Sequence, residues 1–152
     1  MSTTGITLSH VGVCVSDMAR SVRFYTDGLG FEPVIDYQVG PEFGPLMEVE
    51  EPAVASQFLQ RDGVSIELLQ FVSPGHLGDG TRREMNRLGL THFCLRVDDV
   101  DRAAQAIRDA GGTVVESTRT TLELGPGMVT DFVYCTDPDG TRVELMKLPA
   151  AG

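Results

Sequence analysis

The sequence has little positive charge, few cysteines and no long hydrophobic run. It contains 12 Lys and Arg residues against 22 Asp and Glu residues, so the formal net charge at pH 7 is −10. Binding to phosphate groups requires clustered Lys and Arg side chains, and this balance argues against partners such as nucleic acid or an anionic membrane surface. No window approaches the roughly 20 apolar residues that cross a bilayer, so we expect no membrane span.

Cysteine is scarce and occurs in an odd number. Cys14, Cys94 and Cys135 all lie in apolar, strand-like runs, which predicts buried free thiols in a reducing compartment, with a catalytic thiol as the alternative. The N-terminal stretch MSTTGITLSH has neither a basic start nor an apolar signal core. We therefore expect an unprocessed cytoplasmic protein.

What the sequence does contain is an internal repeat. LSHVGVCV near the N-terminus matches LTHFCLRV in the second half, and QFLQRDGVSIELLQF matches YCTDPDGTRVELMKL. The first copy is longer between its two signatures, and its segment 36–53 is expected to form either a rim over a site or an ordinary surface loop. With 152 residues, the chain is predicted to be a single domain (1–152) made of two modules, about 6–73 and 88–149, joined by a Gly-rich connector.

Each copy predicts a strand, a helix and then several strands. Residues 8–15 and 90–97 are rich in β-forming residues, and an Asp at a helix N-cap position, Asp17 or Asp99, follows each run. Helical spacing continues to the glycines at 30 and 111–112. Asp62-Gly63 and Asp139-Gly140 each stand between two apolar runs, and this pattern predicts a hairpin with a tight two-residue turn at the end of both copies.

The alternation of side chains along the strands places four polar groups on one face. His10 lies opposite the aliphatic residues of its strand, and the same count separates His92 from its apolar neighbours. Glu67 and Glu144 are each flanked by two aliphatic residues, so they also lie opposite a helix-covered face. Each residue taken alone fits a polar side chain on a solvated strand. Two imidazoles and two carboxylates at matching positions of a repeat favour the ligand set of a divalent transition metal.

These motifs resemble the vicinal oxygen chelate superfamily, which includes glyoxalase I, methylmalonyl-CoA epimerase, extradiol dioxygenases, fosfomycin-modifying enzymes and bleomycin-binding proteins. HVGVCVSDMARSVRFYTDGLGF, GVSIELLQF, LTHFCLRVDDVD and DPDGTRVELMKL carry the likeness, which covers almost the whole chain. The resemblance implies an α+β fold with two tandem βαβββ modules that form a cupped mixed sheet around one metal ion (Zn, Ni, Co, Mn or Fe). It implies a homodimer and the metal ligands His10, Glu67, His92 and Glu144.

The resemblance also implies a reaction class. With a fourth protein ligand at Glu67, the chain is most similar to the glyoxalase and epimerase branch of the superfamily. In that branch the metal stabilises an enediolate or enolate of a small-molecule substrate. Epimerases of this superfamily carry an extra carboxylate, the second base, on the strand before the one that holds the Glu67 ligand. In this sequence that strand reads AVASQFLQ and has no carboxylate. We therefore expect a lyase or isomerase of the glyoxalase type, with Glu144 as the first choice of base and Glu67 as the second. The alternatives are an Fe(II)-dependent ring-cleaving dioxygenase and a protein that binds a small molecule such as an antibiotic.

Overall fold

The computed structural model describes residues 5–149 and divides the chain into two compact units. The first unit contains the described residues up to Val22 together with Gly30–Leu77. The second contains Arg23–Leu29 and the described residues from Gly78 onward. The segment Arg23–Leu29 therefore belongs by its contacts to the second unit, although it lies within the first copy of the repeat.

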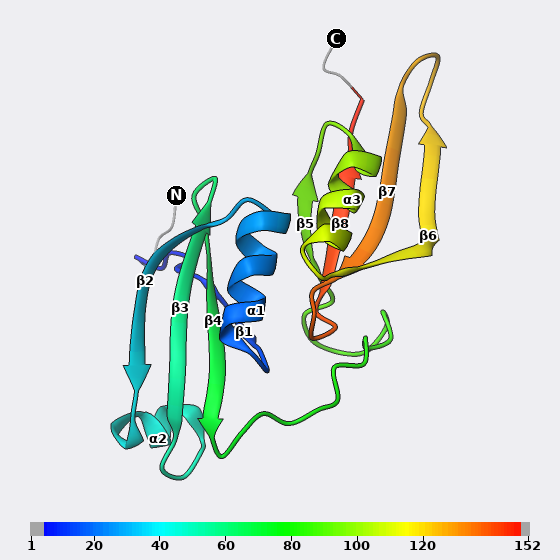
Figure 1. The fold of residues 1–152 in the computed structure, drawn as a ribbon. Coiled ribbons are helices and arrows are strands. Elements are labelled where there is room, and N and C mark those ends of the chain that lie inside the picture. Colours follow the sequence, from blue (N-terminus) through cyan, green and yellow to red (C-terminus); the bar gives the residue numbers. More distant parts are fainter. Residues whose placement is uncertain (1–4, 150–152) are drawn as a thin grey trace. The chain divides into compact units, whose positions relative to one another are not determined.

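The first unit is a four-stranded mixed sheet with one longer helix (Figure 1). Its strands lie in the order β1-β4-β3-β2, with β1 parallel to β4 and the other neighbours antiparallel. The elements are β1 (Val11–Cys14), α1 (Met18–Arg23), β2 (Glu32–Val39), a 3-10 helix (Pro41–Phe43), α2 (Gly44–Met47), β3 (Ala53–Arg61) and β4 (Val64–Ser73).

The second unit repeats this topology. A π-helical turn (Phe24–Gly28) is followed after the connector by β5 (Phe93–Arg96), α3 (Val100–Asp109), β6 (Thr113–Glu123), β7 (Val129–Thr136) and β8 (Arg142–Lys147). The strand order is β5-β8-β7-β6, again with one parallel pair, β5 and β8. The predicted α+β class and the βαβββ order of both copies are therefore confirmed.

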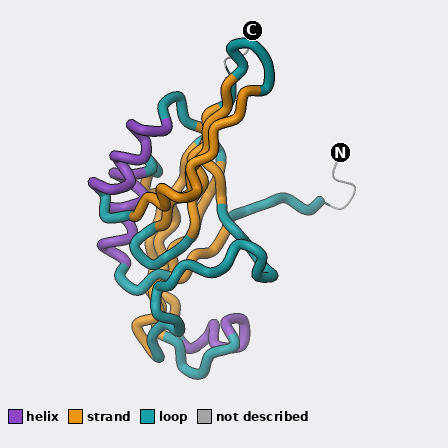
Figure 2. Tube along the Cα trace, turned by 90° about the vertical axis from the view of Figure 1, so that its right-hand side faces the viewer, coloured by secondary structure: helices purple, strands orange, loops and turns teal. Residues whose placement is uncertain are grey.

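Within each unit the longer helix lies beside the strands and not among them (Figure 1 and Figure 2), and the aliphatic rows of the strands supply the core. Ile66 and Leu68 of β4 and Val143 and Leu145 of β8 are buried, and each pair flanks one of the two glutamates. The predicted alternation is thus confirmed in both units. Because full burial of a Leu side chain is worth roughly 1.5–3 kcal/mol, these rows fix which face of each sheet remains for polar groups.

Both helix starts follow the predicted capping. The Arg20 N–H donates to Asp17 Oδ1 at 2.8 Å, and the Arg102 N–H donates to Asp99 Oδ1 at 2.9 Å. These bonds satisfy backbone donors that have no partner inside the first turn. Gly111 follows α3 with a φ of +89°, which is consistent with the predicted glycine stop.

The two hairpins at the ends of the copies differ. Arg61 pairs with Val64, and Asp62 and Gly63 between them have φ values of +50° and +77°, as in the predicted two-residue turn. In the second unit Thr136 pairs with Arg142, so residues 137–141 form a longer loop and the predicted two-residue turn is wrong.

Asp137 explains the longer loop. Its Oδ1 accepts the backbone N–H groups of Asp139 at 2.9 Å and Thr141 at 2.7 Å, and its Oδ2 accepts the Tyr25 hydroxyl at 3.0 Å. The loop closes around this buried carboxylate instead of tightening at Asp139-Gly140. Burial raises the pKa of the Asp137 carboxyl, and burial followed by the nearby Asp137 charge raises the pKa of Tyr25 well above its usual range.

The predicted burial of the thiols is wrong for two of the three cysteines. Cys135 is buried, but Cys14 and Cys94 are exposed, because they lie on the sheet faces opposite the helix-covered rows. The segment 36–53 is only partly a loop, since β2 continues to Val39 and two short helices follow. No helix within residues 5–149 is long and apolar enough to cross a membrane.

Candidate metal centre

The first unit brings His10 and Glu67 together. The parallel pairing of β1 with β4 sets Gly12 opposite Glu67, and His10 precedes Gly12 by two residues on the same face. His10 Nε2 lies 3.1 Å from Glu67 Oε2, with side-chain exposures of 34% and 13% respectively. The predicted pair is thus partly shielded and retains access from one side.

The second unit brings His92 and Glu144 together in the same way. Cys94 of β5 lies opposite Glu144 of β8, and His92 precedes Cys94 by two residues. His92 Nε2 lies 2.9 Å from Glu144 Oε2, with exposures of 23% and 18%. Each unit therefore builds one imidazole–carboxylate pair from its first and last strands.

The repeat extends to the groups that orient the imidazoles. Ser9 Oγ lies 2.9 Å from His10 Nδ1, and Thr91 Oγ1 lies 2.9 Å from His92 Nδ1. A hydrogen bond at Nδ1 holds the ring so that Nε2 faces the carboxylate, as the outer partners of metal-binding histidines do. Sequence comparison aligns Ser9 with Thr91, but only the structure shows that both hydroxyls contact the next residue's ring.

An aromatic side chain supports each imidazole on the neighbouring strand. Phe58 is the register partner of Glu67, and its ring meets His10 edge to face with centroids 4.9 Å apart. Tyr134 is the register partner of Glu144, and its ring meets His92 in the same manner at 5.1 Å. Burial, followed by the negative charge of Glu144, raises the pKa of Tyr134. The pattern of alternation along β3 and β7 could have revealed both aromatic residues.

The carboxylates differ in their remaining contacts. Ser56 Oγ donates to Glu67 Oε1 at 2.7 Å, and Ser56 is only 2% exposed. Glu144 has no such hydroxyl partner among the described residues, and its register partner on β5 is Cys94. Although Cys94 is exposed, partial desolvation of its thiol and the charge of Glu144 raise the pKa of Cys94 to about 11.

Arg142 is a further residue that the sequence did not single out. Its buried guanidinium donates to the carbonyl oxygens of Arg83 at 2.6 Å and Thr91 at 3.4 Å, and it lies over the Tyr134 ring at 5.5 Å from the centroid. Arg142 thus contacts both residues that contact the His92 ring. Its position on β8, two residues before Glu144, places it on the same face as the pair.

The donor atoms fit adjacent positions around a metal ion. Ligand nitrogen and oxygen atoms about 2.1 Å from a metal lie about 3 Å apart when they subtend a right angle. The Nε2–Oε2 distances of 3.1 and 2.9 Å agree with this spacing. Within either unit, the described residues form no group of three or more His, Cys, Asp and Glu side chains suited to a metal ion. Each unit by itself therefore brings together one imidazole and one carboxylate.

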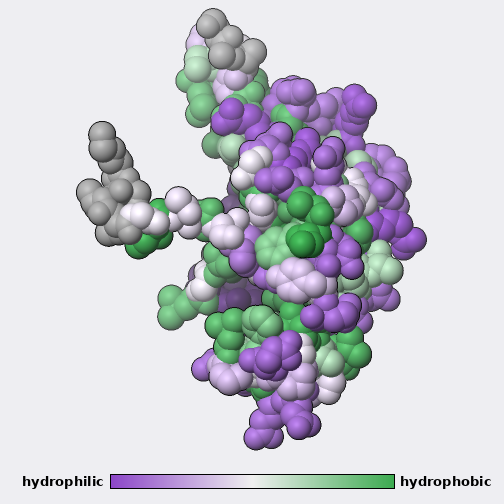
Figure 3. All heavy atoms as spheres, turned by 90° about the vertical axis from the view of Figure 1, so that its left-hand side faces the viewer, coloured by the Kyte–Doolittle hydropathy of each residue, from purple (hydrophilic) through white to green (hydrophobic). Residues whose placement is uncertain are grey.

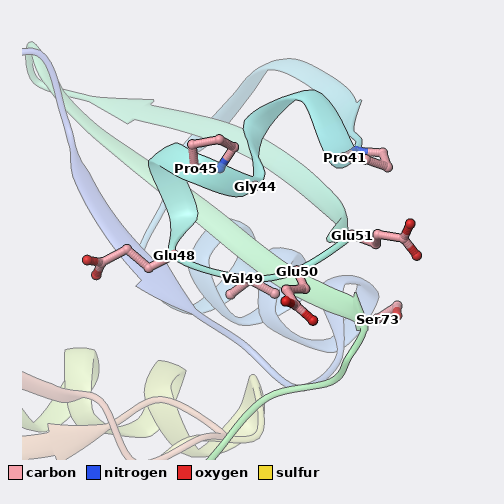
Figure 4. Close-up of a pocket in the computed structure, with 8 residues that line it drawn as sticks. All are labelled: Pro41, Gly44, Pro45, Glu48, Val49, Glu50, Glu51 and Ser73. Carbon is pink, nitrogen blue, oxygen red and sulfur yellow. The ribbon is translucent and has the colours of Figure 1, made fainter.

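The first unit also has a pocket, and its acidic side chains are not arranged around one metal position. It has a volume of about 850 Å³ and lies around α2 and the end of β4. Figure 4 shows that the carboxylates of Glu48, Glu50 and Glu51 point in different directions and do not converge on one position. The lining residues are Pro41, Gly44, Pro45, Glu48, Val49, Glu50, Glu51 and Ser73.

Two curated proteins are similar over most of the chain. A 2-epi-5-epi-valiolone epimerase from Actinomyces sp. is 29% identical over 153 aligned positions, which cover 95% of this chain and 81% of the epimerase. A lactoylglutathione lyase from Salmonella typhimurium is 30% identical over 147 positions, which cover 95% of each protein.

A solved structure and a family profile point to the same family as these two relatives. The crystal structure of a glyoxalase family protein from Bacillus cereus matches with a TM-score of 0.82 at 17% identity and covers 99% of both chains. The profile of the glyoxalase/bleomycin resistance protein/dioxygenase superfamily matches residues 7–145. The predicted family is therefore confirmed, and the chain belongs to the glyoxalase/bleomycin resistance protein/dioxygenase superfamily.

Proposed function

We propose that the protein is a metal-dependent lyase or isomerase that moves a proton next to a carbonyl or hydroxyl group of a small-molecule substrate. The observation that carries this proposal is the His–Glu pair that both units build, each with a hydroxyl at Nδ1 of the imidazole. A polar side chain on a solvated strand would not be expected to have the same oriented partner in both units. The enzymatic relatives support the same class of activity.

The proposed metal ligands are His10, Glu67, His92 and Glu144. Two imidazole nitrogens and two carboxylate oxygens suit a divalent ion such as Zn, Ni, Co, Mn or Fe. The hydroxyls of Ser9 and Thr91 would keep both Nε2 atoms available to the ion. When bound, the ion acts as a Lewis acid that stabilises negative charge on a substrate oxygen.

Glu144 is the proposed base, with Glu67 as the alternative. The Glu144 carboxylate takes the proton from the substrate carbon, and the electron pair of the C–H bond moves toward the adjacent carbonyl oxygen. The protonated Glu144 then returns the proton to the former carbonyl carbon, and the hydroxyl proton moves to the former carbonyl oxygen. The carboxylate is thereby regenerated and no redox partner is needed. His92 Nε2 lies 2.9 Å from Glu144 Oε2, so both atoms could bind the same ion.

The names of the relatives narrow the substrate class. A lactoyl group is a 2-hydroxyacyl group, and the ending of valiolone denotes a ketone, so both names describe a C–H bond beside a carbonyl. Ala55, Ser56 and Gln57 on β3 provide no carboxylate for a second base. This absence from the strand favours one-base proton transfer over epimerisation by two opposed bases.

The proposal includes a homodimer. β2 is an edge strand of the first sheet and exposes Val34, Ile35 and Tyr37. Figure 3, which shows the side of the molecule at the left of Figure 1, has apolar residues scattered among hydrophilic ones. An exposed edge with apolar side chains is a surface that a second copy can cover. Light scattering at micromolar concentration measures the mass, and a monomeric value would contradict this part of the proposal.

Metal binding provides the first test. The purified protein should hold about one divalent ion per chain, measured by elemental analysis, and His10→Ala and His92→Ala should each lose most of it. The exposed loop residue His76 provides the control, since His76→Ala removes an imidazole that belongs to neither pair. Undiminished metal in the first two variants would contradict the ligand assignment.

The other function classes predict different results. A ring-cleaving dioxygenase would require Fe(II) and consume O₂ with a catechol, whereas a binding protein would retain a small molecule without needing metal. The proposed enzyme instead exchanges an α-hydrogen with solvent deuterium, which NMR detects with lactoylglutathione or 2-epi-5-epi-valiolone as probes. Catechol-dependent O₂ consumption, or an absence of bound metal, would favour the respective alternative.

A further inference from the structure

We infer that Ser56 is a positioning residue that holds Glu67 as a fixed metal ligand and thereby leaves Glu144 as the carboxylate that moves the proton. This inference rests on the proposed metal site. The hydroxyl of Ser56 donates to Glu67 Oε1 at 2.7 Å, while Glu67 Oε2 faces His10 Nε2 at 3.1 Å. Both oxygens of Glu67 therefore have a polar partner.

The burial of Ser56 makes this contact persistent. Ser56 is 2% exposed, so water has little access to replace the hydroxyl at Glu67 Oε1. Rotation of the Glu67 carboxylate would leave the buried Ser56 hydroxyl without its acceptor, which is unfavourable. The contact thus opposes the detachment and rotation that a carboxylate needs when it takes a proton from substrate.

The second unit has an apolar side chain at the matching position. Ser56 pairs with Leu69, two residues beyond Glu67 on β4, and the corresponding pair on β7 and β8 is Phe132 with Met146. The register partner of Glu144 on β5 is Cys94, and a thiol is only a weak donor. Glu144 is therefore less firmly held than Glu67, although the two glutamates share the same strand position and the same contact to an imidazole.

Co(II) affinity of the full chain, measured by competition with a chelator, tests the role of Ser56. Ser56→Ala should raise the Kd for Co(II) by about 10- to 100-fold, as loss of an outer hydrogen bond to a ligand typically does. Ser21→Ala is the matched control. Ser21 is a fully buried serine of the same unit whose hydroxyl has no hydrogen-bond partner among the described residues. The Kd of the Ser21→Ala variant for Co(II) should stay within about threefold of the parent value.

A double-mutant cycle separates positioning from a general packing effect. If Ser56 acts through Glu67, Ser56→Ala should change the Kd by less than about threefold when Glu67→Gln is already present. An equal effect in both backgrounds, or an equal loss in Ser21→Ala, would overturn the inference. Ser56→Thr retains the hydroxyl and should recover most of the parent affinity.

The outcomes also distinguish this inference from the proposed function. A parent protein that binds Co(II) and loses it in His10→Ala, but not in Ser56→Ala, would overturn the role of Ser56 alone. A parent protein that binds no Co(II), or that binds it equally well without His10, would overturn the proposed metal site and this inference with it.

Discussion

The two units build the same pair of side chains but surround it differently. In both, a hydroxyl lies 2.9 Å from the histidine Nδ1, and an aromatic ring meets the imidazole edge to face. The first unit adds a buried hydroxyl that donates to the carboxylate, whereas in the second unit the register partner of the carboxylate is a cysteine. Repetition thus preserves the orientation of the two imidazoles, while the positions around the two carboxylates differ.

The side chains that contact the neighbours of each histidine also differ between the two units. In the second unit the Arg142 guanidinium contacts the Thr91 carbonyl and the Tyr134 ring, and both of these residues contact His92. The matching position in the first repeat is Ser65, which lacks a cationic side chain. The His92 side chain is also less exposed than the His10 side chain, at 23% against 34%.

The largest expected effect concerns the two glutamates. Glu144→Gln should slow exchange of the substrate α-hydrogen with deuterated water by about 10²- to 10⁴-fold at saturating metal, because the variant lacks the proton acceptor. The matched Glu67→Gln variant should weaken metal binding and regain most of its exchange when excess metal is added. NMR of both variants with the same probe compound measures the rates. Equal exchange in parent and Glu144→Gln protein would assign the base to Glu67 or to another group.

The next effect separates the two hairpin turns. Asp137→Ala removes an acceptor from two backbone N–H groups and the Tyr25 hydroxyl, so the free energy of unfolding should fall by about 3 kcal/mol. Asp62 is exposed at a φ of +50°, where glycine is well tolerated, and Asp62→Gly should change that free energy by about 0.5 kcal/mol or less. Urea titrations compare the variants. Similar losses would mean that the buried carboxylate does not hold its loop.

A smaller effect is expected at Arg142. Arg142→Met retains apolar volume but leaves the carbonyls of Arg83 and Thr91 without the guanidinium, and should lower the free energy of unfolding by about 2 kcal/mol. It should also weaken Co(II) binding several-fold through the less restrained His92. Ser65→Ala, the matching change in the first unit, should leave both quantities close to the parent values. A metal affinity unchanged by Arg142→Met would show that Thr91 and Tyr134 orient His92 without it.

Much of the fold could be predicted because it depends on local patterns. Apolar alternation determines which strand face is buried, and the capping carboxylates of Asp17 and Asp99 determine where the helices start. The same alternation selected His10 and His92, which lie beside Glu67 and Glu144 as a shared face requires. Their role as metal ligands stays a prediction.

The rest depends on contacts between residues far apart in the sequence. The prediction of a two-residue turn at Asp139-Gly140 was wrong because Asp137 accepts hydrogen bonds from Tyr25, a residue of the first copy, and from two backbone groups of its own loop. Ser56 and Arg142 are polar residues in strands, and only register with the neighbouring strands reveals their contacts. Neither a local pattern nor a motif carries that information.

The smallest expected effect is the pH dependence that distinguishes the Asp137 loop from the Asp62 turn. Burial raises the pKa of Asp137 in the folded protein above its ordinary value of 3.8. Between the unfolded and folded pKa values, the native chain binds a proton that the unfolded chain has released. The contribution of Asp137 to stability is therefore fully present below the unfolded pKa and is lost as the pH rises through the folded pKa.

Asp137→Asn removes this ionisation while retaining a carbonyl oxygen as an acceptor. The free energy of unfolding of parent and variant should be measured by urea titration from pH 4 to pH 7, with Asp62→Asn as the control in the exposed turn. The parent should lose stability relative to Asp137→Asn as the pH rises, because only the parent must ionise a buried carboxyl group. The difference between parent and Asp62→Asn should remain nearly constant. If the parent instead gained stability relative to Asp137→Asn, the hydrogen bonds from Tyr25, Asp139 and Thr141 would outweigh the burial of the charge, and the carboxylate would be the preferred form in the folded protein.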